Sequence, residues 1–245
     1  MSGAPSIHWL DRVPSTQDLA HQLAADGAED GTAVVAVEQT AGRGSRGREW
    51  ASPRGGLWLS VVVRPPAARV AETLSLRAAL AAAGALEALG IEGIRVKWPN
   101  DLMLDDRKLG GILCEARWSG DVLGWIVIGA GINVANEIPV PLRATATSLS
   151  AGGYGHASGD LASPLIAALR AAADAPGPLA PDEVAAFGRR DWLAGRLIDA
   201  PLRGIADGIA SDGTLRVRDA NGAVSTVRTG PVLVAAGRAH LTPHS

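Results

Sequence analysis

A loop rich in glycine and arginine, GRGSRG at residues 42–47, is the first stretch of this chain that could do chemistry. Its glycines match the G-x-G-x-x-G spacing of a dinucleotide-binding turn, which opens a helix and precedes an acidic residue about 20 positions later. Here Pro53 and the glycines at 55–56 interrupt any helix, and no acidic residue lies between Val61 and Val70. The sequence therefore argues against a dinucleotide-binding turn.

The same loop has the composition of an anion-binding segment. Across residues 43–54 a single acidic residue, Glu49, accompanies four arginines: Arg43, Arg46, Arg48 and Arg54. Guanidinium groups form bidentate hydrogen bonds with carboxylates and phosphates. Glycines also let backbone N–H groups approach a ligand closely. A solvated basic turn is the alternative, because this composition alone does not separate the two.

Two lysines mark a second stretch, VKWPNDLMLDDRKLGGIL at residues 96–113. Lys97 and Lys108 are the only lysines among 23 basic residues, and they flank a Pro-Asn-Asp turn. A compact ammonium suits a position where one charge meets a phosphate or carboxylate oxygen. Chance placement of two surface lysines is the alternative. A third stretch, GAGINV at 129–134, either brings backbone close to a ligand or simply ends a strand.

The elements that must position these stretches alternate between helix and strand. Ser15 and Asp18 form a capping-box-like start to a short helix that ends near Gly27. The remaining patterns predict strands over 32–39 and 57–65, an alanine-rich helix over 70–89, an antiparallel meander over 94–134, and helices within 160–194 broken at 174–181.

The residue pattern of the sequence changes after Gly195. Short strands separated by SDG and NG turns predict a small β-barrel of about fifty residues. The predicted fold class is therefore α+β, with one domain over residues 1–192 and a barrel domain over residues 193–245.

Composition restricts the function classes. A formal charge of −2 and a pI near 6.2 do not suggest a general polyanion binder. No export signal is present, so the expected location is the cytoplasm, and charged residues interrupt the most apolar stretch, which excludes a membrane span. Strand-like sequence begins by Thr32, so no helix-turn-helix module and no DNA binding are expected. One cysteine and five scattered histidines indicate neither a disulfide nor a metal site.

Three motifs, in this order and spacing, resemble the biotin protein ligases: EQTAGRGSRGREW, VKWPNDLML with RKLGGIL, and IGAGINV. The resemblance runs from about Ser15 to the C-terminus, where GIADGIASDGTLRVRD is similar to the SH3-like barrel that closes these enzymes. It implies a mixed-sheet catalytic domain of the class II aminoacyl-tRNA synthetase and biotin ligase type. It also implies the short form of the family, which lacks the N-terminal DNA-binding domain, as either a monomer or a homodimer.

The resemblance further implies an activity. Such an enzyme activates biotin with ATP and Mg²⁺ to biotinyl-5'-AMP. It then transfers biotin to one lysine of the biotin carboxyl carrier domain of acetyl-CoA or acyl-CoA carboxylase. Negative charges meet when a carboxylate attacks an α-phosphate, so cations and N–H donors should dominate catalysis. A loop ordered over the intermediate would keep water away.

By the same resemblance, residues of the three motifs receive roles. Lys108, placed between the biotin carboxylate and the α-phosphate, and Arg43 are assigned to catalysis. Biotin binding is assigned to Ser15, Thr16, Gln17, Gln39, Gly42, Arg43, Gly44, Ser45, Lys108, Gly110 and Gly111. Contacts with ATP or the adenylate are assigned to Arg43, Arg46, Arg48, Trp50, Asn100, Lys108 and Asn133. No residue is assigned to a metal, and Trp50 could instead be an ordinary core residue.

Two positions depart from the family pattern. The family usually has asparagine where this chain has Gln17, whose longer side chain puts the contact with biotin in doubt. It usually has arginine where this chain has Ser45. A hydrogen bond from such an arginine to a charged group contributes about 1.5–3 kcal/mol. We therefore expect weaker retention of biotinyl-AMP unless Arg46 compensates.

Other functions leave more of the sequence unexplained. A lipoate–protein ligase shares the activated-acid chemistry, but it lacks this loop and barrel, and its substrate has no ureido ring for Ser15 and Gln39 to bind. A biotin-responsive repressor needs a DNA-binding module. A purely structural α+β scaffold gives no purpose to the arginine loop or the two lysines.

Overall fold

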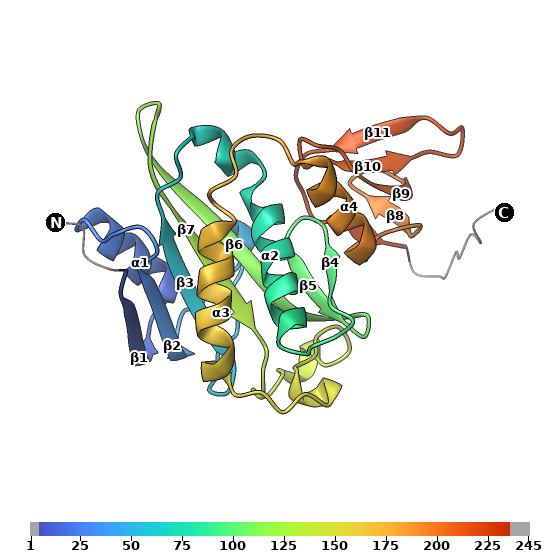
Figure 1. Ribbon diagram of the computed structural model, residues 1–245. Helices are drawn as coiled ribbons and strands as arrows, with labels where there is room; N and C mark the ends of the chain where they lie inside the picture. Colours follow the sequence, from blue (N-terminus) through green and yellow to red (C-terminus); the bar gives the residue numbers. More distant parts are fainter. Residues whose placement is uncertain (1–4, 236–245) are drawn as a thin grey trace.

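The fold is a mixed α+β arrangement of two β-sheets, described for residues 5–235 by a computed structural model (Figure 1). The larger sheet has seven strands. In spatial order they are β1 (Ile7–Val13), β2 (Ala33–Gln39), β3 (Leu57–Val63), β7 (Val122–Ile132), β6 (Arg107–Ser119), β5 (Asp101–Leu104) and β4 (Arg95–Lys97). The predicted α+β class is thus confirmed.

Four α-helices accompany the sheets in the described part of the chain. They are α1 (Thr16–Ala25), α2 (Leu74–Ala88), α3 (Ser158–Ala171) and α4 (Pro181–Arg190). Short 3₁₀ segments lie at Ser45–Gly47, Ala68–Glu72, Val140–Leu142 and Ser150–Gly152. The helix predicted over 70–89 is therefore present in shortened form, preceded by a 3₁₀ turn.

Helix α1 covers one face of the large sheet, and the pair α2–α3 covers the other. Neighbouring strand residues belong to different apolar clusters because alternate residues of a strand point to opposite faces. Val34 and Val62 pack with Ala20 of α1 in a small apolar cluster. Their sequence neighbours Val35 and Val61 belong to the main core, which also contains the apolar residues of α2 and α3. Figure 1 shows α2 and α3 side by side in front of the sheet. The α1 face is consequently left open beyond the end of that helix.

The meander predicted over 94–134 is confirmed. Strand β4 pairs with β5, β5 with β6, and β6 with β7, each antiparallel. Asp105 and Asp106 occupy the tight turn between β5 and β6, both with positive φ angles. This pairing brings the second and third motifs, which are separated in sequence, onto adjacent strands.

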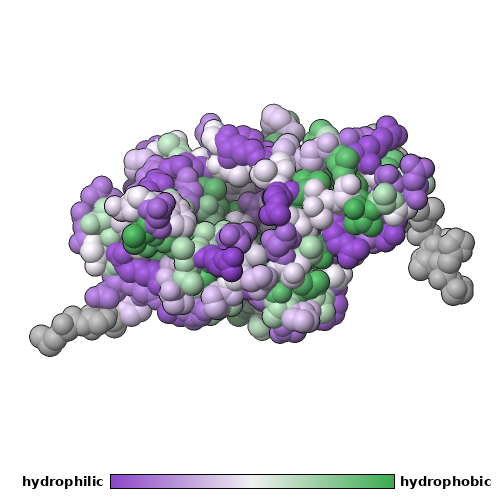
Figure 2. All heavy atoms as spheres, turned by 90° about the horizontal axis from the view of Figure 1, so that it is seen from above, coloured by the Kyte–Doolittle hydropathy of each residue, from purple (hydrophilic) through white to green (hydrophobic). Residues whose placement is uncertain are grey.

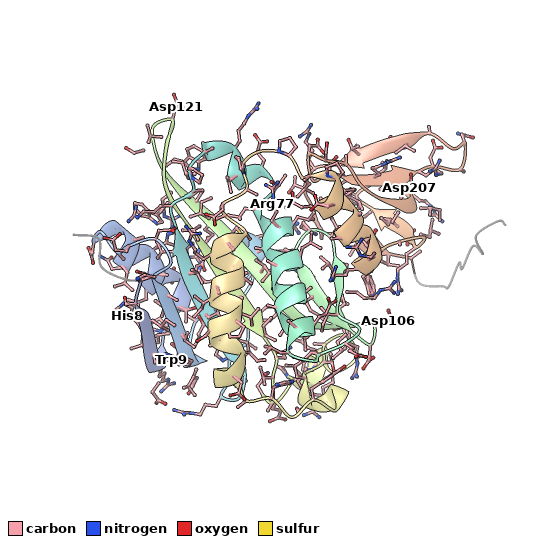
Figure 3. The ribbon with its side chains drawn as sticks, viewed as in Figure 1. His8, Trp9, Arg77, Asp106, Asp121 and Asp207 are labelled. Carbon is pink, nitrogen blue, oxygen red and sulfur yellow. The ribbon has the colours of Figure 1, made fainter. Side chains whose placement is uncertain are left out.

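Strand β1 was not predicted by the sequence patterns. It pairs in parallel with β2 at the edge of the sheet, and most of its residues are exposed. Figure 3 labels His8 and Trp9 on this strand, where 54% of the Trp9 surface is exposed. An edge strand with little buried surface has no strong apolar alternation. Its pairing therefore depends on contact with β2 rather than on its own composition.

The C-terminal strands form a separate antiparallel sheet of five strands in the described residues. In spatial order they are β11 (Val224–Val227), β10 (Leu215–Arg218), β9 (Gly204–Ile209), β8 (Leu197–Ala200) and β12 (Leu233–Val234). No pairing between β11 and β12 closes this sheet within residues 5–235. The predicted barrel domain extends to residue 245, and its last ten positions lie outside the described residues.

The C-terminal sheet is fastened to the rest of the molecule by specific contacts. The Trp98 indole donates a hydrogen bond to the Gly213 carbonyl at 2.8 Å.

Arg77, 4% exposed, donates to Glu183 of α4 and to carbonyls of the segment 175–178 (Figure 3). A buried guanidinium needs such partners for its donors. These contacts hold the linker between α3 and α4.

The surface shows no broad apolar belt in the view of Figure 2, where hydrophobic residues occur as separate small patches among hydrophilic ones. Within residues 5–235, no helix has the length and apolar character needed to cross a membrane.

Candidate active site

A pocket of about 540 Å³ opens on the α1 face of the large sheet. Its floor is made by small residues of adjacent strands. Ser60 of β3 pairs with Gly129 of β7, and Gly131 of β7 pairs with Gly111 of β6. With no side chain beyond a hydroxymethyl group, these four positions let other groups approach the sheet closely.

Two of the three floor glycines, Gly129 and Gly131, have neighbours that a side chain at these positions would clash with. A Cβ atom at Gly129 would lie 2.5 Å from the Gln17 Oε1 atom, and one at Gly131 would lie 2.7 Å from the Trp50 Nε1 atom. Both distances are far shorter than a van der Waals contact. At Gly111 the nearest atoms, on Lys108, would be 3.5 Å away, which is ordinary contact. Gly129 and Gly131 thus admit the neighbouring side chains Gln17 and Trp50.

A chain of hydrogen bonds lines the end of the pocket next to helix α1. The Gln39 Oε1 atom accepts from the Thr16 backbone N–H at 2.8 Å and from the Thr16 hydroxyl at 3.0 Å. The Gln39 amide N–H donates to the Ser52 hydroxyl at 2.8 Å, and Ser52 donates to the Trp50 carbonyl. The Ser60 and Thr16 hydroxyl oxygens lie 2.9 Å apart. The amide orientation of Gln39 is therefore set by its partners.

Gln17 completes this chain of hydrogen bonds. Its side chain is buried, with Nε2 donating to the Val127 carbonyl at 3.1 Å and Oε1 accepting from the Ser60 hydroxyl at 3.0 Å. Ser15 is the N-cap of α1 and accepts from the Asp18 backbone N–H at 3.5 Å. The predicted helix start is thereby confirmed. The longer glutamine arm reaches strand β7 rather than pointing freely into the pocket.

Lys108 projects into the same pocket from strand β6. Its Nζ atom lies 2.7 Å from the Asp101 carboxylate and 4.9 Å from the centre of the Trp50 ring. Two backbone hydrogen bonds hold its strand position, from Lys108 N–H to the Thr145 carbonyl at 2.7 Å and from Thr147 N–H to the Lys108 carbonyl at 2.9 Å. The Trp50 Nε1–H is buried and has no hydrogen-bond partner among residues 5–235. It is an unused donor packed against Gly131 of the pocket floor.

Lys97 supplies a second ammonium to the pocket lining. Its Nζ atom lies 5.3 Å from the centre of the Trp192 ring, whose indole donates to Asp106 at 2.8 Å. Burial lowers the pKa of Lys97 below its ordinary value, Asp101 opposes that shift, and the positive charge of Lys108 adds to it. The two lysines singled out by the sequence therefore share one pocket.

The glycine- and arginine-rich loop is a folded hairpin above this pocket. The Gly44 N–H donates to the Arg48 carbonyl, and the Trp50 N–H donates to the Gly42 carbonyl, both at 2.8 Å. Arg46 has a φ angle of 60°, the left-handed conformation of a tight turn. The Arg48 guanidinium donates to the Ser45 hydroxyl at 3.0 Å. The loop does not open a helix longer than one 3₁₀ turn, consistent with the argument against a dinucleotide-binding turn.

Most residues assigned to the site by resemblance line the main pocket. They are Ser15, Thr16, Gln17, Gln39, Arg43, Gly44, Ser45, Arg48, Trp50, Asn100, Lys108, Gly111 and Asn133. Gly42 and Arg46 line an adjoining groove together with Arg43 and Arg48, whereas Gly110 lines neither. Gly110 lies on the other face of β6, where a Cβ atom would be 2.7 Å from the Gly131 carbonyl oxygen.

The two asparagines of the site hold backbone segments in place. The Asn100 amide donates to the Ile112 carbonyl at 2.5 Å. The Asn133 amide donates to the Thr147 carbonyl at 3.0 Å, and its oxygen accepts from Asn136 at 3.1 Å. These bonds hold strand β6, which carries Gly111 and Lys108, and the segment that pairs with it. The side-chain nitrogens of both asparagines are thus used within the protein.

Sequence reasoning missed several residues of the pocket and its rim. The polar ones include Ser60, Asp101, Asp106, Glu49, Asn136 and Thr145 in the main pocket, and Asp18 and Glu115 beside the loop. Ser60 had a detectable signal, because it is the one polar residue in the apolar strand LWLSVVV. A buried hydroxyl in such a strand needs a partner. The carboxylates had no such signal, since acidic side chains are usually solvated and carry no local sign of a partner.

Comparison with known proteins identifies the class of protein. Residues 9–133 match the Biotin/lipoate A/B protein ligase family. The chain belongs to that family.

Among curated relatives, the chain is 37% identical over 227 residues to the biotin–[acetyl-CoA-carboxylase] ligase of Paracoccus denitrificans, covering 85% of this chain and 92% of that protein. It is 42% identical over 148 residues to the bifunctional ligase/repressor BirA of Bacillus subtilis, covering 58% of this chain and 45% of BirA. The chain thus spans less than half the length of that relative.

Among solved structures, the fold is similar to that of the biotin protein ligase from Aquifex aeolicus in complex with biotin and ATP. The TM-score is 0.80 at 25% sequence identity, with 95% of this chain and 99% of that chain covered. The similarity includes the C-terminal part of the chain because the coverage exceeds residues 9–133.

Proposed function

We propose that this chain is a biotin–[acetyl-CoA-carboxylase] ligase. It forms biotinyl-5'-AMP from biotin and ATP, releases pyrophosphate, and transfers biotin to a lysine of a biotin carboxyl carrier domain. The observation that carries the proposal is the combination, in one pocket, of the Gln39–Thr16–Ser60 hydrogen-bond chain with the Lys108 ammonium. The names of the Paracoccus relative and the Aquifex complex support it.

The hydrogen-bond chain suits the ureido ring of biotin, which presents two N–H donors and one carbonyl acceptor. Thr16 donates its hydroxyl proton to Gln39, so its oxygen can accept a ligand N–H. The Ser15 oxygen accepts the capping bond, so its proton can be donated to the ureido carbonyl. The glycines of the floor leave room for the apolar part of the ligand beside Gln17 and Trp50. An analogue without the ureido group would leave these buried groups unpaired.

Lys108 then meets the other end of the ligand. In the first step a biotin carboxylate oxygen attacks the α-phosphorus of ATP, and the bond to pyrophosphate breaks. Negative charge gathers where Lys108, Lys97 and Arg48 line the pocket. In the second step the amine of a carrier lysine attacks the acyl carbon, and AMP leaves. The hairpin loop above the pocket keeps water from the mixed anhydride.

Magnesium fits this site as a companion of the triphosphate. Residues 5–235 hold no group of three or more histidine, cysteine or carboxylate side chains that could form a cage. Mg²⁺ is commonly bound by one or two carboxylates, substrate phosphates and waters. Asp101 and Asp106 are the pocket aspartates that could serve, and the ion would neutralise phosphate charge. The use of ATP fits the cytoplasmic location expected from the sequence.

The finer architecture is part of the proposal. We divide the chain into a biotin/lipoate-ligase-type catalytic domain at 1–192 and a C-terminal SH3-like barrel at 193–245. Five short antiparallel strands joined by tight turns support the barrel assignment. The turn at Gly195, with a φ angle of 72°, supports the boundary, since α4 ends at Arg190 and β8 begins at Leu197.

The test is a biotin-dependent exchange of labelled pyrophosphate into ATP, followed by transfer of labelled biotin to a carrier domain. We expect both activities, and expect Lys108→Met to lower the exchange rate by about 10²–10³-fold. Arg69→Met, at an exposed arginine outside the pocket, is the matched control. Exchange with lipoate but not with biotin would favour the lipoate–protein ligase alternative. No exchange with either acid would refute the proposal.

A further inference from the structure

We propose that Arg43 is a positioning residue that fastens the glycine- and arginine-rich loop over the pocket, held by Asp18 and Glu115 as a carboxylate latch. This role differs from the catalytic role that resemblance assigns to Arg43. The consequence for retention of the adenylate rests on the function proposed above. The latch itself is a property of the folded chain without ligand.

The geometry of Arg43 is that of a bridge between two elements. Its Nη1 atom is hydrogen-bonded to the Asp18 carboxylate on α1, and its Nη2 atom lies 2.6 Å from the Glu115 carboxylate on β6. Both terminal nitrogens are therefore engaged by carboxylates. Each contact takes one N–H of a nitrogen that carries two, so the two carboxylates hold the guanidinium from both ends and compensate its positive charge. Lys108, by contrast, faces the pocket with Asp101 as its only ion-pair partner among the described residues.

The buried His21 ring lies next to Glu115, and Trp125 contacts His21. The Trp125 indole N–H donates to the His21 Nδ1 atom at 3.0 Å, so the neutral ring carries its proton on Nε2. That Nε2 atom faces the Glu115 Oε2 atom at 3.7 Å. Within residues 5–235, neither of these two buried atoms has a hydrogen-bond partner. The His21 Nε2 atom is thus directed toward the Glu115 carboxylate, although the distance is too long for a hydrogen bond.

The same contacts keep His21 from becoming a competing cation. A second proton on its ring would have to displace the indole N–H from Nδ1. Burial, followed by the positive charge of Arg117, lowers the pKa of His21, and Glu115 opposes the shift. Arg43 lowers the pKa slightly further and Asp18 raises it. Near neutral pH His21 is therefore uncharged, and among residues 5–235 Arg43 is the cation that pairs with both carboxylates of the latch.

Fastening Arg43 fastens the whole hairpin. Arg43 forms an isolated β-bridge with Glu49, and the next residue along, Trp50, is bound to the Gly42 carbonyl. Trp50 is the loop residue that reaches the pocket floor at Gly131. The two halves of the latch differ in exposure, since the side chain is 22% exposed for Glu115 and 55% for Asp18. Solvent screens the Asp18 half more strongly. Glu115 should therefore hold the loop more firmly.

The experiment measures tryptic cleavage of the loop in the full chain without ligand. Trypsin can cut after Arg43, Arg46 and Arg48, and mass spectrometry gives the rate at each site. We expect Glu115→Gln, which keeps the shape but removes the charge, to raise these rates by about two- to tenfold. Asp18→Asn should have a smaller effect, and the double variant the largest. Asp174→Asn, which removes the exposed ion pair with Arg170, is the matched control.

Arg43→Lys is the second variant, because it keeps a tryptic site and a charge but cannot span two carboxylates. It should raise cleavage after Arg46 and Arg48 as much as Glu115→Gln does. Cleavage elsewhere and the thermal unfolding midpoint, followed by circular dichroism, report on folding. Loop rates that equal those of the control in Glu115→Gln, in the double variant and in Arg43→Lys would overturn the latch.

A second measurement links the latch to the proposed reaction. Rapid dilution after adenylate formation should show faster release of biotinyl-AMP from Glu115→Gln than from the parent chain. If Arg43 instead binds the substrate, removing the carboxylates frees its guanidinium, and release should slow. The proteolysis needs neither biotin nor ATP. A chain that forms no adenylate would refute the proposed function while leaving the latch tested by cleavage alone.

Discussion

The Lys108 ammonium lies 2.7 Å from the Asp101 carboxylate, across the turn that joins strands β5 and β6. The two residues are seven positions apart in the sequence, and antiparallel pairing of the strands brings them together diagonally, since Asp101 is opposite Gly111 and Lys108 is opposite Met103. A cation with one carboxylate partner is already oriented before a second anion arrives. Such preorganisation lowers the reorganisation needed when charge develops.

Asp101→Asn tests this relationship. Without the carboxylate the lysine side chain gains rotamers, so we expect kcat/KM for biotin-dependent pyrophosphate exchange to fall about tenfold. The fall should be smaller than that of Lys108→Met, which removes the charge itself. Steady-state exchange kinetics measure both. An Asp101→Asn variant with the parent kcat/KM would show that the ion pair does not orient the lysine.

Gly129→Ala tests the glycine floor. The added Cβ atom would lie 2.5 Å from the Gln17 amide oxygen and would displace that side chain from its bond with Ser60. We expect KM for biotin to rise about tenfold, because the polar end of the pocket loses its geometry. Gly84→Ala, in helix α2 with no atom within 4 Å, is the control and should not raise KM. An unchanged KM in Gly129→Ala would remove the steric argument.

Ser60→Ala tests the buried hydroxyl that sequence reasoning missed. It leaves the Gln17 oxygen without its donor, and an unsatisfied buried group costs about 1–3 kcal/mol. We expect the free energy of unfolding, measured in urea, to fall by that amount and the affinity for biotin to fall with it. Ser225→Ala on the exposed strand β11 is the control, with an effect within about 0.5 kcal/mol. Equal effects at both serines would contradict the hydrogen-bond chain.

Ser45→Arg tests the departure from the family loop. The Ser45 hydroxyl now accepts from Arg48, and an arginine would replace that acceptor with a cation beside the pocket. We expect slower release of biotinyl-AMP after rapid dilution, by about tenfold. Ser45→Ala, which removes the hydroxyl without adding charge, should not slow release. If Ser45→Arg releases the intermediate at the parent rate, the missing arginine does not weaken retention.

Asp191→Asn tests a pH dependence of stability at the junction of the two sheets. Burial raises the pKa of Asp191 to about 6 from an ordinary value of 3.8, although its carboxylate accepts from Leu193 N–H at 2.8 Å. The folded chain therefore holds this proton more tightly than the unfolded chain. Its contribution to stability is fully present below pH 3.8 and is lost as the pH rises through about 6.

The comparison of parent and variant isolates that group. Between about pH 4 and pH 7 the parent should lose about 2–3 kcal/mol of unfolding free energy relative to Asp191→Asn. Urea unfolding at several pH values measures the difference. A constant difference across this range would mean that Asp191 titrates normally. Measuring the difference between two chains cancels the contributions of the other carboxyl groups.

Local patterns in the sequence determined the elements that depend on neighbouring residues. The capping serine predicts the start of α1, β-branched runs predict β2 and β3, and tight turns predict the meander β4–β7. The same patterns bring the second and third motifs together, because consecutive antiparallel strands are neighbours. Both lysines lie in the second motif, so they could be expected near one site from the sequence alone.

Tertiary structure alone decided which distant residues meet. Strand β1 exists through its pairing with β2, and Gln17 finds its partners on β3 and β7. Glu115 and Asp18 lie 97 positions apart and meet only at Arg43. A charged side chain carries no local sign of its partner, since ion pairs form across elements whose packing is set by the apolar core. Residue types thus predict the chemistry of this site, and the packing of α1 against the sheet decides how it is held.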